Sequence, residues 1–402
     1  MMLFRPVILL LVALSAEGAL LPGFRVEKVA SLPAGKYATS IAVDSNGTLY
    51  FTTTDGDLYR GAERVAHLPT FADGNSGLLG MALVDEETAV VHYTNAPITR
   101  HVISTVDLTT GQETVLHELV ADISMPDRPA PTEHHGGNPT VAPDGSVYFG
   151  IGDFGGGVIA MDPKWNAGKI WRIAPDGTLE QFARGLRNPY DMAWDPDTQR
   201  LFVTDNGALA GDEVHLITKG DYCGWPFTYG NLAPIEGAVP PDYVWEDTTA
   251  PTGVAYLTGA NSYLRRGGFL VGGFVSGALY LFPSLQKPIA EPLRLVDRGF
   301  GNILDVVESV DGTIFFTNGV AIHRLDFPKR GDCNGDGVVN VQDILALNRE
   351  LADGDPHRAH EAQSGLNAGS WGCDADADGL IGSADLEALS RKVGRHRAVR
   401  RR

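Results

Sequence analysis

The sequence predicts an all-β protein: a six-bladed β-propeller followed by a small α-helical calcium-binding module. Three observations carry this prediction. A strand–turn–strand pattern recurs through the first 330 residues, turn-forming residues abound (48 Gly and 24 Pro), and no long amphipathic helical pattern occurs before residue 330. The chain has 402 residues, 43% of them hydrophobic, so it can bury a sizeable core in two domains.

The repeated units share one order: apolar residues, a polar turn, and an alternating strand that ends in small or polar residues. Five units follow it, at residues 41–54, 80–94, 139–153, 190–207 and 304–318. A sixth, 267–282, has the strands without the same turn. The turns Asn46-Gly47, Asp144-Gly145 and Asp311-Gly312 favour two-residue hairpins. A spacing of about 50 residues is typical of four-stranded propeller blades, whereas a β-sandwich would not repeat one motif so often.

The N-terminus has the pattern of an export signal. Arg5 precedes an apolar run at 7–14, and small residues follow it. We therefore expect a signal peptide at 1–18 and a secreted, periplasmic or cell-surface protein. An uncleaved anchor is the alternative, but the run is shorter than the roughly 20 residues that a membrane span needs. No transmembrane span is expected after signal cleavage.

The net charge excludes two classes of partner. The chain has 32 Lys and Arg against 50 Asp and Glu, a net charge of −18. Phosphate repels so acidic a surface, so neither nucleic acid nor anionic lipid is an expected partner. Acidity suits an exported protein or one that binds Ca²⁺ through carboxylates. The residues 394–402 form a separate basic tail, interpreted as a solvated end.

Two carboxylate-rich loops near the C-terminus have the spacing of calcium-binding loops. In each, oxygens at positions 1, 3, 5 and 12 and the backbone carbonyl at position 7 can surround one Ca²⁺, and each loop leads into a short helix. In the first loop positions 1, 3, 5, 7, 9 and 12 hold Asp332, Asn334, Asp336, Val338, Asn340 and Asp343. In the second they hold Asp374, Asp376, Asp378, Leu380, Gly382 and Asp385. The alternative is an ordinary acidic surface loop, but the full spacing of a calcium-binding loop occurs twice.

Paired loops with Asp at position 12, each followed by one helix, resemble a type I dockerin. The resemblance implies a module at 329–393 that holds Ca²⁺ and binds a cohesin-bearing scaffold protein. Loop positions 10 and 11 differ between the halves, Val341-Gln342 against Ser383-Ala384, so a calcium-stabilised terminal module is the alternative. The matched placement of Cys333 and Cys373 suggests a disulfide between the halves. Cys223 then remains as a small buried thiol.

The region 19–328 carries a set of ordered motifs: NSGLLGMA, EHHGGNPTVAPDGSVYFGIGD, GKIWRI, GLRNPYDMAWDP, TDNGALAGDEVHLI and DYCGWP. In this order they resemble the glucose/sorbosone dehydrogenase family, six-bladed soluble quinoproteins that use pyrroloquinoline quinone (PQQ). The resemblance implies a dehydrogenase of an aldose or related sugar with PQQ and Ca²⁺. The alternative is a non-catalytic propeller that binds carbohydrate or protein.

The resemblance implies roles for three residues in catalysis. His134 aligns with the family's base, with His135 as the runner-up. Asp153 matches the residue that orients that base. Arg187 matches the cation that stabilises charge on the quinone oxygen. The alternative for His134 is a surface or core histidine with no catalytic role. The alternative for Arg187 is a structural arginine that pairs with Asp191 or Asp153.

Further matches concern the cofactor and its metal. Asn188, with Arg187, matches a pair that contacts the quinone, and Asn75 and Asn206 could hydrogen-bond a cofactor. Gly207 and Ala208 match positions whose carbonyls hold the active-site Ca²⁺. Glu213 is interpreted as support for a structural Ca²⁺ or for the loop itself, and Trp225 as core packing.

The sequence departs from the family where PQQ carboxylates should be held. The family supplies a Lys and two Arg, and this chain has Val275, Asn302 and Leu304 at those places. Three other cations could substitute: Arg265, Arg266 or Arg298. Weaker cofactor binding, another orientation or no cofactor all fit this pattern.

Overall fold

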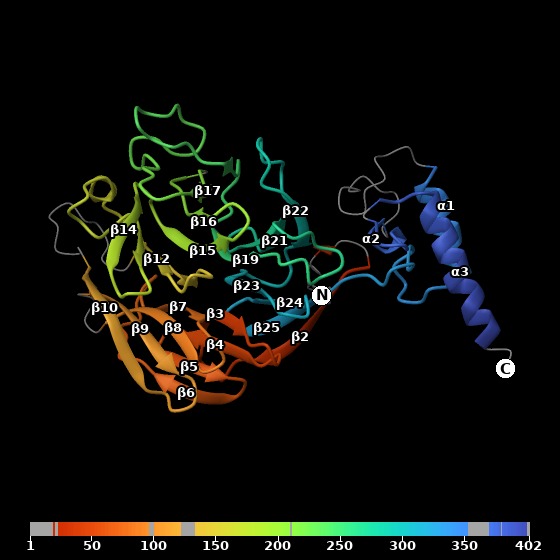
Figure 1. The fold of residues 1–402 in the computed structure, drawn as a ribbon, viewed down its shortest axis with the longest axis horizontal. Helices are drawn as coiled ribbons and strands as arrows, with labels where there is room; N and C mark the ends of the chain where they lie inside the picture. Colours follow the sequence, from red (N-terminus) through yellow and green to blue (C-terminus); the bar gives the residue numbers. More distant parts are fainter. Residues whose placement is uncertain are drawn as a thin grey trace, which may run out of the picture.

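The computed structural model describes residues 19–20, 23–95, 100–121, 133–209, 211–352, 370–378 and 380–399. The predicted signal peptide at 1–18 lies outside the described residues, as does Gly379 of the second calcium loop. The predicted fold class is confirmed: six antiparallel sheets are arranged in a ring, and a small helical module lies beside it (Figure 1). No helix in the described ranges is long and apolar enough to cross a membrane.

The first three blades are four-stranded sheets in which neighbouring strands follow one another along the chain. Blade 1 contains β3 (Ala38–Val43), β4 (Leu49–Thr53), β5 (Asp57–Arg60) and β6 (Glu63–His67). Blade 2 contains β7 (Leu78–Leu83), β8 (Thr88–Thr94), β9 (Arg100–Asp107) and β10 (Glu113–Val120). Blade 3 contains β11 (Thr140–Val141), β12 (Val147–Ile151), β13 (Lys169–Ile173) and β14 (Leu179–Arg184), with a 3₁₀ turn at Gly157–Ala160.

The remaining blades follow the same order with two additions from the N-terminus. Blade 4 contains β15 (Pro189–Asp195), β16 (Arg200–Asp205), β17 (Glu213–Ile217) and β18 (Tyr243–Val244). Blade 5 contains β19 (Pro251–Tyr256), β20 (Phe269–Gly273), β21 (Ala278–Phe282) and β22 (Leu293–Asp297), and β1 (Ala19–Leu20) pairs with its edge. Blade 6 contains β23 (Asp305–Glu308), β24 (Ile314–Thr317), β25 (Ala321–Asp326) and β2 (Arg25–Ser31).

Blade 6 closes the ring with strands from both ends of the propeller sequence. Strand β2 pairs antiparallel with β25, with Arg25 opposite Asp326 and Ser31 opposite Ala321. The backbone hydrogen bonds of this pair therefore hold the first and last strands of the propeller together. Closure leaves each blade packed between two neighbours, and apolar clusters fill the spaces between sheets. The ring of Phe202 in blade 4, for example, stacks on that of Phe269 in blade 5 at 4.3 Å.

The predicted Asx-Gly turns join the first two strands of their blades, but the prediction of two-residue hairpins was wrong. In each turn the N–H of the glycine donates to the carbonyl three residues earlier, and only the glycine has a positive φ, whereas a two-residue type I′ turn needs it at both central residues. Gly47, Gly145 and Gly312 have φ of 82°, 83° and 82°, a region that favours glycine. In the first turn, the carboxylate of Asp44 accepts the N–H groups of Asn46 and Thr48. The unit at 267–282 is different because it contains β20 and β21, the second and third strands of blade 5. The first strand, β19, precedes it, which explains why that unit lacks the expected turn.

The helical module contains α1 (Val341–Glu350), α2 (Ser370–Cys373) and α3 (Ser383–Val399). Asn340 caps α1, and Asp343 completes a capping box with the backbone of Asn340. The predicted disulfide between Cys333 and Cys373 is confirmed, with the Cα atoms 4.2 Å apart, and Cys223 is buried and free of disulfides. Helix α3 continues to Val399, so the residues assigned to a separate tail from 394 begin inside a helix.

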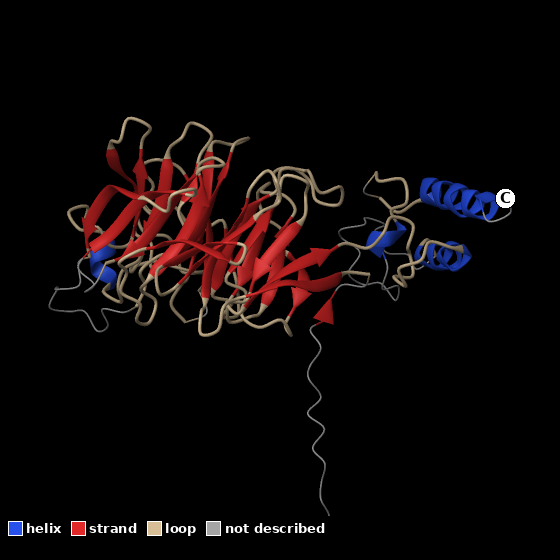
Figure 2. Ribbon diagram, turned by 90° about the horizontal axis from the view of Figure 1, so that it is seen from below, coloured by secondary structure: helices blue, strands red, loops and turns tan. Residues whose placement is uncertain are grey.

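The helical module lies beside one edge of the propeller (Figure 2), and an aromatic cluster joins the two. Trp371 of α2 is 3% exposed and packs edge-on against Phe24 at 5.3 Å, near Phe327 and Tyr263. The guanidinium of Arg330 lies 4.2 Å over the Tyr263 ring and donates to the Ser262 carbonyl at 2.5 Å. The expectation from the short linker at 326–330, that the two modules lie close together, is therefore confirmed.

Trp371 should hold the module against the propeller. We expect Trp371→Ala to remove about 3–5 kcal/mol of packing free energy, the usual cost of truncating a buried tryptophan. Limited proteolysis of the 326–330 linker should become faster, while the propeller keeps its melting temperature. Leu345→Ala is the control, because that side chain is 51% exposed. Equal proteolysis rates for wild type and Trp371→Ala would contradict the assignment.

Candidate functional site

A cavity of about 510 Å³ opens at one end of the propeller axis. It is lined by residues at or just before the start of the innermost strands, among them Tyr37, Leu79, Tyr190, Thr252 and Leu304. The three asparagines predicted to contact a cofactor, Asn75, Asn188 and Asn206, all line it. Among the described residues that line this cavity, none is Lys or Arg. Its polar groups are neutral amides and hydroxyls.

His134 and Asp153 lie next to this cavity and contact each other. The Nδ1 atom of His134 is 2.7 Å from Oδ1 of Asp153, while Gly136 of the same loop lines the cavity. The His134 side chain is 13% exposed and that of Asp153 1%. His134 has a φ of 51°, a strained value for a residue with a side chain. The predicted base and its orienting carboxylate are therefore paired at the same end of the propeller.

Trp225 belongs to this pair rather than to the core. Its indole Nε1 donates to Oδ2 of Asp153 at 2.8 Å, so Asp153 receives both His134 and Trp225. The interpretation of Trp225 as core packing was wrong, because its polar edge is needed here and the ring is only partly buried. Burial alone would raise the pKa of Asp153, but the bond from His134 and those from Gly155 and Trp225 outweigh it and hold the pKa below its usual range.

Arg187 lies beside the residues just described, His134, Asp153 and Trp225. Its Nη1 donates to the carbonyl of Asn206 at 2.8 Å, and its guanidinium lies 5.7 Å from the centre of the Trp225 ring. The alternative of an ion pair with Asp191 or Asp153 does not occur. The carboxylate of Asp205 instead accepts the backbone N–H groups of Arg187 and Asn188, at 2.9 and 2.6 Å.

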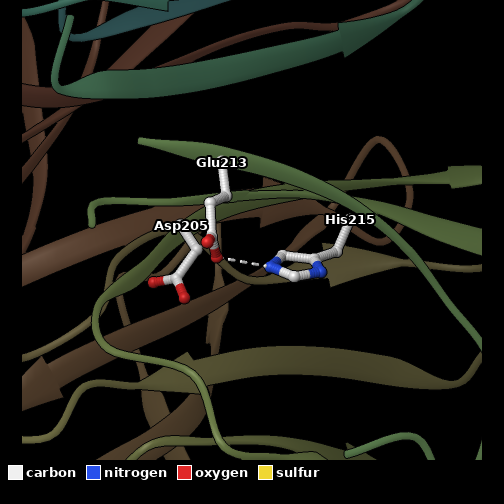
Figure 3. A group of neighbouring side chains, drawn as sticks. All are labelled: Asp205, Glu213 and His215. Atoms are coloured by element: carbon white, nitrogen blue, oxygen red, sulfur yellow. Dashed lines mark hydrogen bonds and ion pairs between the residues drawn. The ribbon is translucent and has the colours of Figure 1, made fainter. Parts of the chain in front are cut away.

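Asp205 belongs to a buried cluster that sequence analysis did not find, with Glu213 and His215 (Figure 3). Nε2 of His215 lies 2.8 Å from Oε2 of Glu213, and the imidazole also contacts Cys223. Burial and the Glu213 charge raise the pKa of Asp205 to about 7. Burial would lower the pKa of His215, but its contacts with Cys223 and Glu213 raise it well above the usual range. One ligand atom from each of the three clustered residues lies within 4.8 Å of the others, yet each is engaged within the protein.

The cluster supports the site from behind. Through Asp205 it fixes the backbone of the Arg187–Asn188 pair, and Glu213 accepts the N–H of Gly230 in the following loop. This geometry agrees with the loop-supporting role expected for Glu213. The sequence signal that could have found it is the alternation of Glu213 and His215 on one face of β17.

The loop at Gly207 and Ala208 lies beside the cavity. Asp212 accepts the N–H of Gly207 at 3.0 Å and those of Thr249 and Ala250 at 2.7 and 2.8 Å. Ala250 lines the cavity. A side chain at Gly207 would lie 1.7 Å from the Gly211 carbonyl oxygen, so only glycine fits. Within the described part of the chain no N–H donates to the carbonyls of Gly207 and Ala208, which leaves both oxygens able to coordinate a cation.

His135, the runner-up for the base, points elsewhere. Its ring is fully buried, with Nδ1 3.3 Å from Nε2 of His101, whose Nδ1 lies 2.8 Å from Nε2 of His92. Nδ1 of His92 donates to the carbonyl of Gly137 at 3.0 Å. Burial lowers the pKa of His92 to about 4 and that of His101 well below its usual range. This chain of histidines braces the His134–Gly137 loop from the interior.

The missing cations are not replaced. Leu304 lines the cavity, Val275 is 59% exposed, and Asn302 is exposed. Arg265, Arg266 and Arg298 are exposed and do not line the cavity. Arg266 instead pairs with Asp197 at 2.9 Å and borders a second cavity, which is lined by later residues of the innermost strands.

In the first calcium loop, burial and the nearby charges of Asp332 and Asp336 raise the pKa of the Asp343 carboxyl. Asp332 is 2% exposed, and its Oδ1 has no hydrogen-bond partner, as expected for a metal ligand. Asp343 at position 12 is fully buried and accepts the N–H groups of Asn334 and Asn340. The other predicted ligands, Asn334, Asp336, Val338 and Asn340, lie on the same turn.

The second loop brings Asp374, Asp376 and Asp378 together, with one oxygen of each within 4.8 Å of the others. Asp385 at position 12 is 1% exposed and accepts the N–H groups of Ala375, Asp376 and Gly382. Leu380 follows Asp378, whose Oδ1 accepts its N–H. Oδ2 of Asp374 pairs with Arg330 at 2.5 Å, so this loop is connected to the propeller interface.

Comparison with known proteins identifies a family for the propeller and another for the C-terminal helical module. The glucose/sorbosone dehydrogenase family matches residues 27–321, and the dockerin type I domain matches residues 330–394. An uncharacterized protein of Synechocystis is 29% identical over 36% of this chain and 43% of its own length. The aldose sugar dehydrogenase YliI of Escherichia coli is 24% identical over 45% of this chain and 56% of its own. The chain thus covers about half of each of these relatives.

A solved structure shares the fold of the propeller. The PQQ-bound aldose sugar dehydrogenase of Streptomyces coelicolor has a TM-score of 0.62 and 22% identity, over 77% of this chain and all of that chain.

Asp153→Asn should weaken the propeller in a pH-dependent way. Because the folded-state pKa of Asp153 lies below the unfolded value of about 3.9, its contribution is present above that value and is lost as pH falls through the folded pKa. We expect a loss of about 1–3 kcal/mol near pH 6 that shrinks below pH ~4. Denaturant titrations at several pH values measure it, with exposed Asp162→Asn as the control. A pH-independent difference would contradict the lowered pKa of Asp153.

Removal of Ca²⁺ should unfold the helical module before the propeller. Each site saturated at 100 times its Kd contributes about 2.7 kcal/mol, which is lost on chelation. Circular dichroism of the intact protein should then show a separate helical transition at lower temperature, reversed by Ca²⁺. Asp378→Ala should reproduce part of this shift, whereas exposed Asp162→Ala should not. A helical transition that chelation does not move would refute calcium binding by the loops.

Proposed function

Because the chain belongs to the glucose/sorbosone dehydrogenase family, we propose that its propeller is an exported oxidoreductase that oxidises an aldose or related sugar. The single observation that carries this proposal is the His134–Asp153 pair beside the axial cavity. A histidine whose Nδ1 bonds a buried carboxylate presents Nε2 as a proton acceptor. Trp225 and Arg187 fix the same carboxylate and the cavity wall, so the group is built as a unit.

In this mechanism a sugar hydroxyl in the cavity donates its proton to Nε2 of His134. Asp153 keeps the ring in the required tautomer and stabilises the imidazolium that forms. Arg187 provides a fixed positive charge near the cavity wall, where it stabilises negative charge that develops on an acceptor oxygen. PQQ, when bound, supplies the acceptor for the two electrons and the hydrogen that leave the sugar carbon.

The cavity fits a planar quinone through neutral donors. Asn75, Asn188 and Asn206 can hydrogen-bond its oxygens, and Tyr37 and Tyr190 add rings and hydroxyls to the wall. The carbonyls of Gly207 and Ala208 would hold a Ca²⁺ beside it. Without lysine or arginine in the lining, three carboxylates gain only neutral hydrogen bonds, about half as strong as charge-assisted ones. Cofactor binding should therefore be weaker than in a pocket with cations.

The neutral lining is also the observation that favours the second candidate, a propeller that binds carbohydrate or protein without catalysis. Amides and hydroxyls are suited to sugar hydroxyls, and no cofactor is then needed. In that case His134 and Asp153 would serve only as hydrogen-bonding groups. The two candidates differ in whether added PQQ and Ca²⁺ produce turnover.

The C-terminal module would attach this domain to a cohesin-bearing scaffold outside the cell. The dockerin match and the paired calcium loops support this assignment. Secretion, or retention in the periplasm or at the cell surface, follows from the expected signal peptide at 1–18 and agrees with the disulfide.

The test is reconstitution with PQQ and Ca²⁺, followed by dye reduction over a panel of sugars. His134→Ala should lower kcat by about 10²–10⁴, the range for loss of a general base. His117→Ala, on the outer strand of blade 2, is the matched control and should leave kcat unchanged. His135→Ala should affect kcat far less than His134→Ala.

Each outcome separates the two candidates. Activity that survives in His134→Ala would refute the assigned base. Tight sugar binding by calorimetry, without dye reduction at any PQQ concentration, would establish the binding propeller in place of the enzyme.

A further inference from the structure

The second calcium loop and the propeller share the side chain of Arg330, which is 17% exposed. Its Nη1 donates to the carbonyl of Asp374 at 3.0 Å and to Oδ2 of the same residue at 2.5 Å. Its Nη2 donates to the carbonyl of Ser262 at 2.5 Å, and the guanidinium lies over the ring of Tyr263. One guanidinium therefore contacts position 1 of the loop with one arm and the propeller with the other.

The backbone of Arg330 is held within the helical module. Nζ of Lys392 in α3 donates to the carbonyls of Arg330 and Ala375, at 3.1 and 2.8 Å. The N–H of the next residue, Gly331, donates to the carbonyl of Gly372 at 2.7 Å. Because these bonds fix the Arg330 backbone beside the second loop, it is the Arg330 side chain that reaches across to the propeller.

The aspartate at position 1 has different partners in the two loops. In the first loop, Oδ2 of Asp332 accepts the N–H of Gly337, and Oδ1 has no hydrogen-bond partner. In the second loop, Oδ1 of Asp374 accepts the N–H of Ala377, and Oδ2 accepts from Arg330. The first loop therefore presents a carboxylate oxygen that is ready for a cation, whereas the second presents one that already contacts a guanidinium.

The cations beside the first loop lie at its backbone instead. Nζ of Lys329 donates to the carbonyl of Gly337 at 2.9 Å, and a Cβ added at Gly337 would lie 2.7 Å from Nη2 of Arg25. Burial and the charges of two neighbouring carboxylates raise the pKa of Asp343, as expected where like charges lie close together. A cation that enters this loop relieves that repulsion and meets no arginine on its position 1 ligand.

The segment that begins the second loop also holds the module on the propeller. Trp371, three residues before Asp374, packs against Phe24. Between them lies Cys373, which is bonded to Cys333 of the first loop. Because so few residues separate Asp374 from Trp371, a change in the position of the Asp374 carboxylate acts directly on the contact between module and propeller.

We propose that Arg330 competes with Ca²⁺ for Asp374, so that calcium in the second loop loosens the module from the propeller. Two cations on one carboxylate repel each other, and the divalent ion has the stronger attraction for the cluster of acidic ligands. When the ion binds, Arg330 loses its contact with Asp374, and the link from the loop to Ser262 and Tyr263 is broken.

Coupling of this kind is reciprocal. Docking of the module weakens calcium binding in the second loop by the same factor by which calcium weakens docking. The first loop therefore fills at a lower Ca²⁺ concentration and keeps the module folded, while the second loop reports a higher concentration by releasing it. This inference rests on the proposed calcium binding by the two loops and is independent of the proposed oxidoreductase activity.

Calcium titration of the intact, chelator-treated protein by isothermal calorimetry tests the competition. The binding step that disappears in Asp378→Ala belongs to the second loop. Arg330→Gln should raise the affinity of that step about tenfold, within the usual range for coupled sites. Arg391→Gln is the matched control: it removes the same charge from an exposed position of α3, where solvent screens it, and should change the affinity less than about twofold.

Two results of this titration would overturn the proposal in different ways. If the second step of a folded Arg330→Gln protein is no tighter than that of wild type, calcium binds but the competition is absent. If Asp378→Ala removes no binding step, the second loop does not bind calcium, and the inference fails together with the assignment on which it rests.

Cleavage of the linker by chymotrypsin at Phe327 measures docking directly. In wild type it should be slow when the first loop alone is filled and faster when the second loop is filled as well. Calcium that only stabilised the module would slow the cleavage at the second step, which would contradict the competition. In Arg330→Gln, filling of the second loop should no longer accelerate the cleavage.

Tyr263→Ala tests the competition without a change of charge, and it also serves if Arg330→Gln fails to fold. The substitution removes the ring over which the guanidinium lies, so Arg330 is held less firmly on Asp374. The affinity of the second step should rise, though by less than in Arg330→Gln. A second step no tighter than that of wild type in this variant would refute the proposal.

Discussion

The pairing of β2 with β25 is the interaction on which the rest of the structure depends. It joins Arg25 near the start of the propeller to Asp326 near its end, so the six sheets form a closed ring. Closure forces the innermost strands of all blades to converge on one axis. The axial cavity and the buried contacts of Asn138 with Asp191 and Asp305 both exist because of that convergence, and each takes its side chains from segments far apart in sequence.

The features that sequence analysis predicted correctly are local ones. The positions of the turns at Gly47, Gly145 and Gly312 were predicted from adjacent residues, although each turn is longer than the two residues expected, and each calcium loop lies within about twelve residues. The pairing of His134 with Asp153 was also accessible, because one hairpin returns the chain to the same end of a blade. The unit at 267–282 was recognised by its strand pattern, but the sequence did not show that it contains the second and third strands of its blade, because β20 and β21 alternate as a first pair of strands does.

The support of the site could not be predicted, because its contacts cross between blades. Trp225 reaches Asp153 over 72 positions of sequence, and Asp205 of β16 holds the backbone of the loop before β15. The pattern of residues within one strand does not show which carboxylate of a distant strand it will contact. The same holds for Trp371, whose burial against Phe24 joins opposite ends of the chain.

The side chains that each innermost strand places along the axis decide which parts of the channel are neutral and which contain carboxyl groups. At one end, neutral amides and tyrosines line a cavity, and the Arg187 guanidinium is held behind the wall by Asn206 and Trp225. At the middle of the axis, Asp191 and Asp305 meet without any counter-ion among the described residues. One repeated fold thus places a hydrogen-bonding cavity and the buried carboxyl groups of Asp191 and Asp305 on innermost strands, because residues one or two positions apart face different parts of the channel. Substitution of Asp191 or Asp305 can therefore change the stability of the propeller while it leaves the composition of the cavity intact.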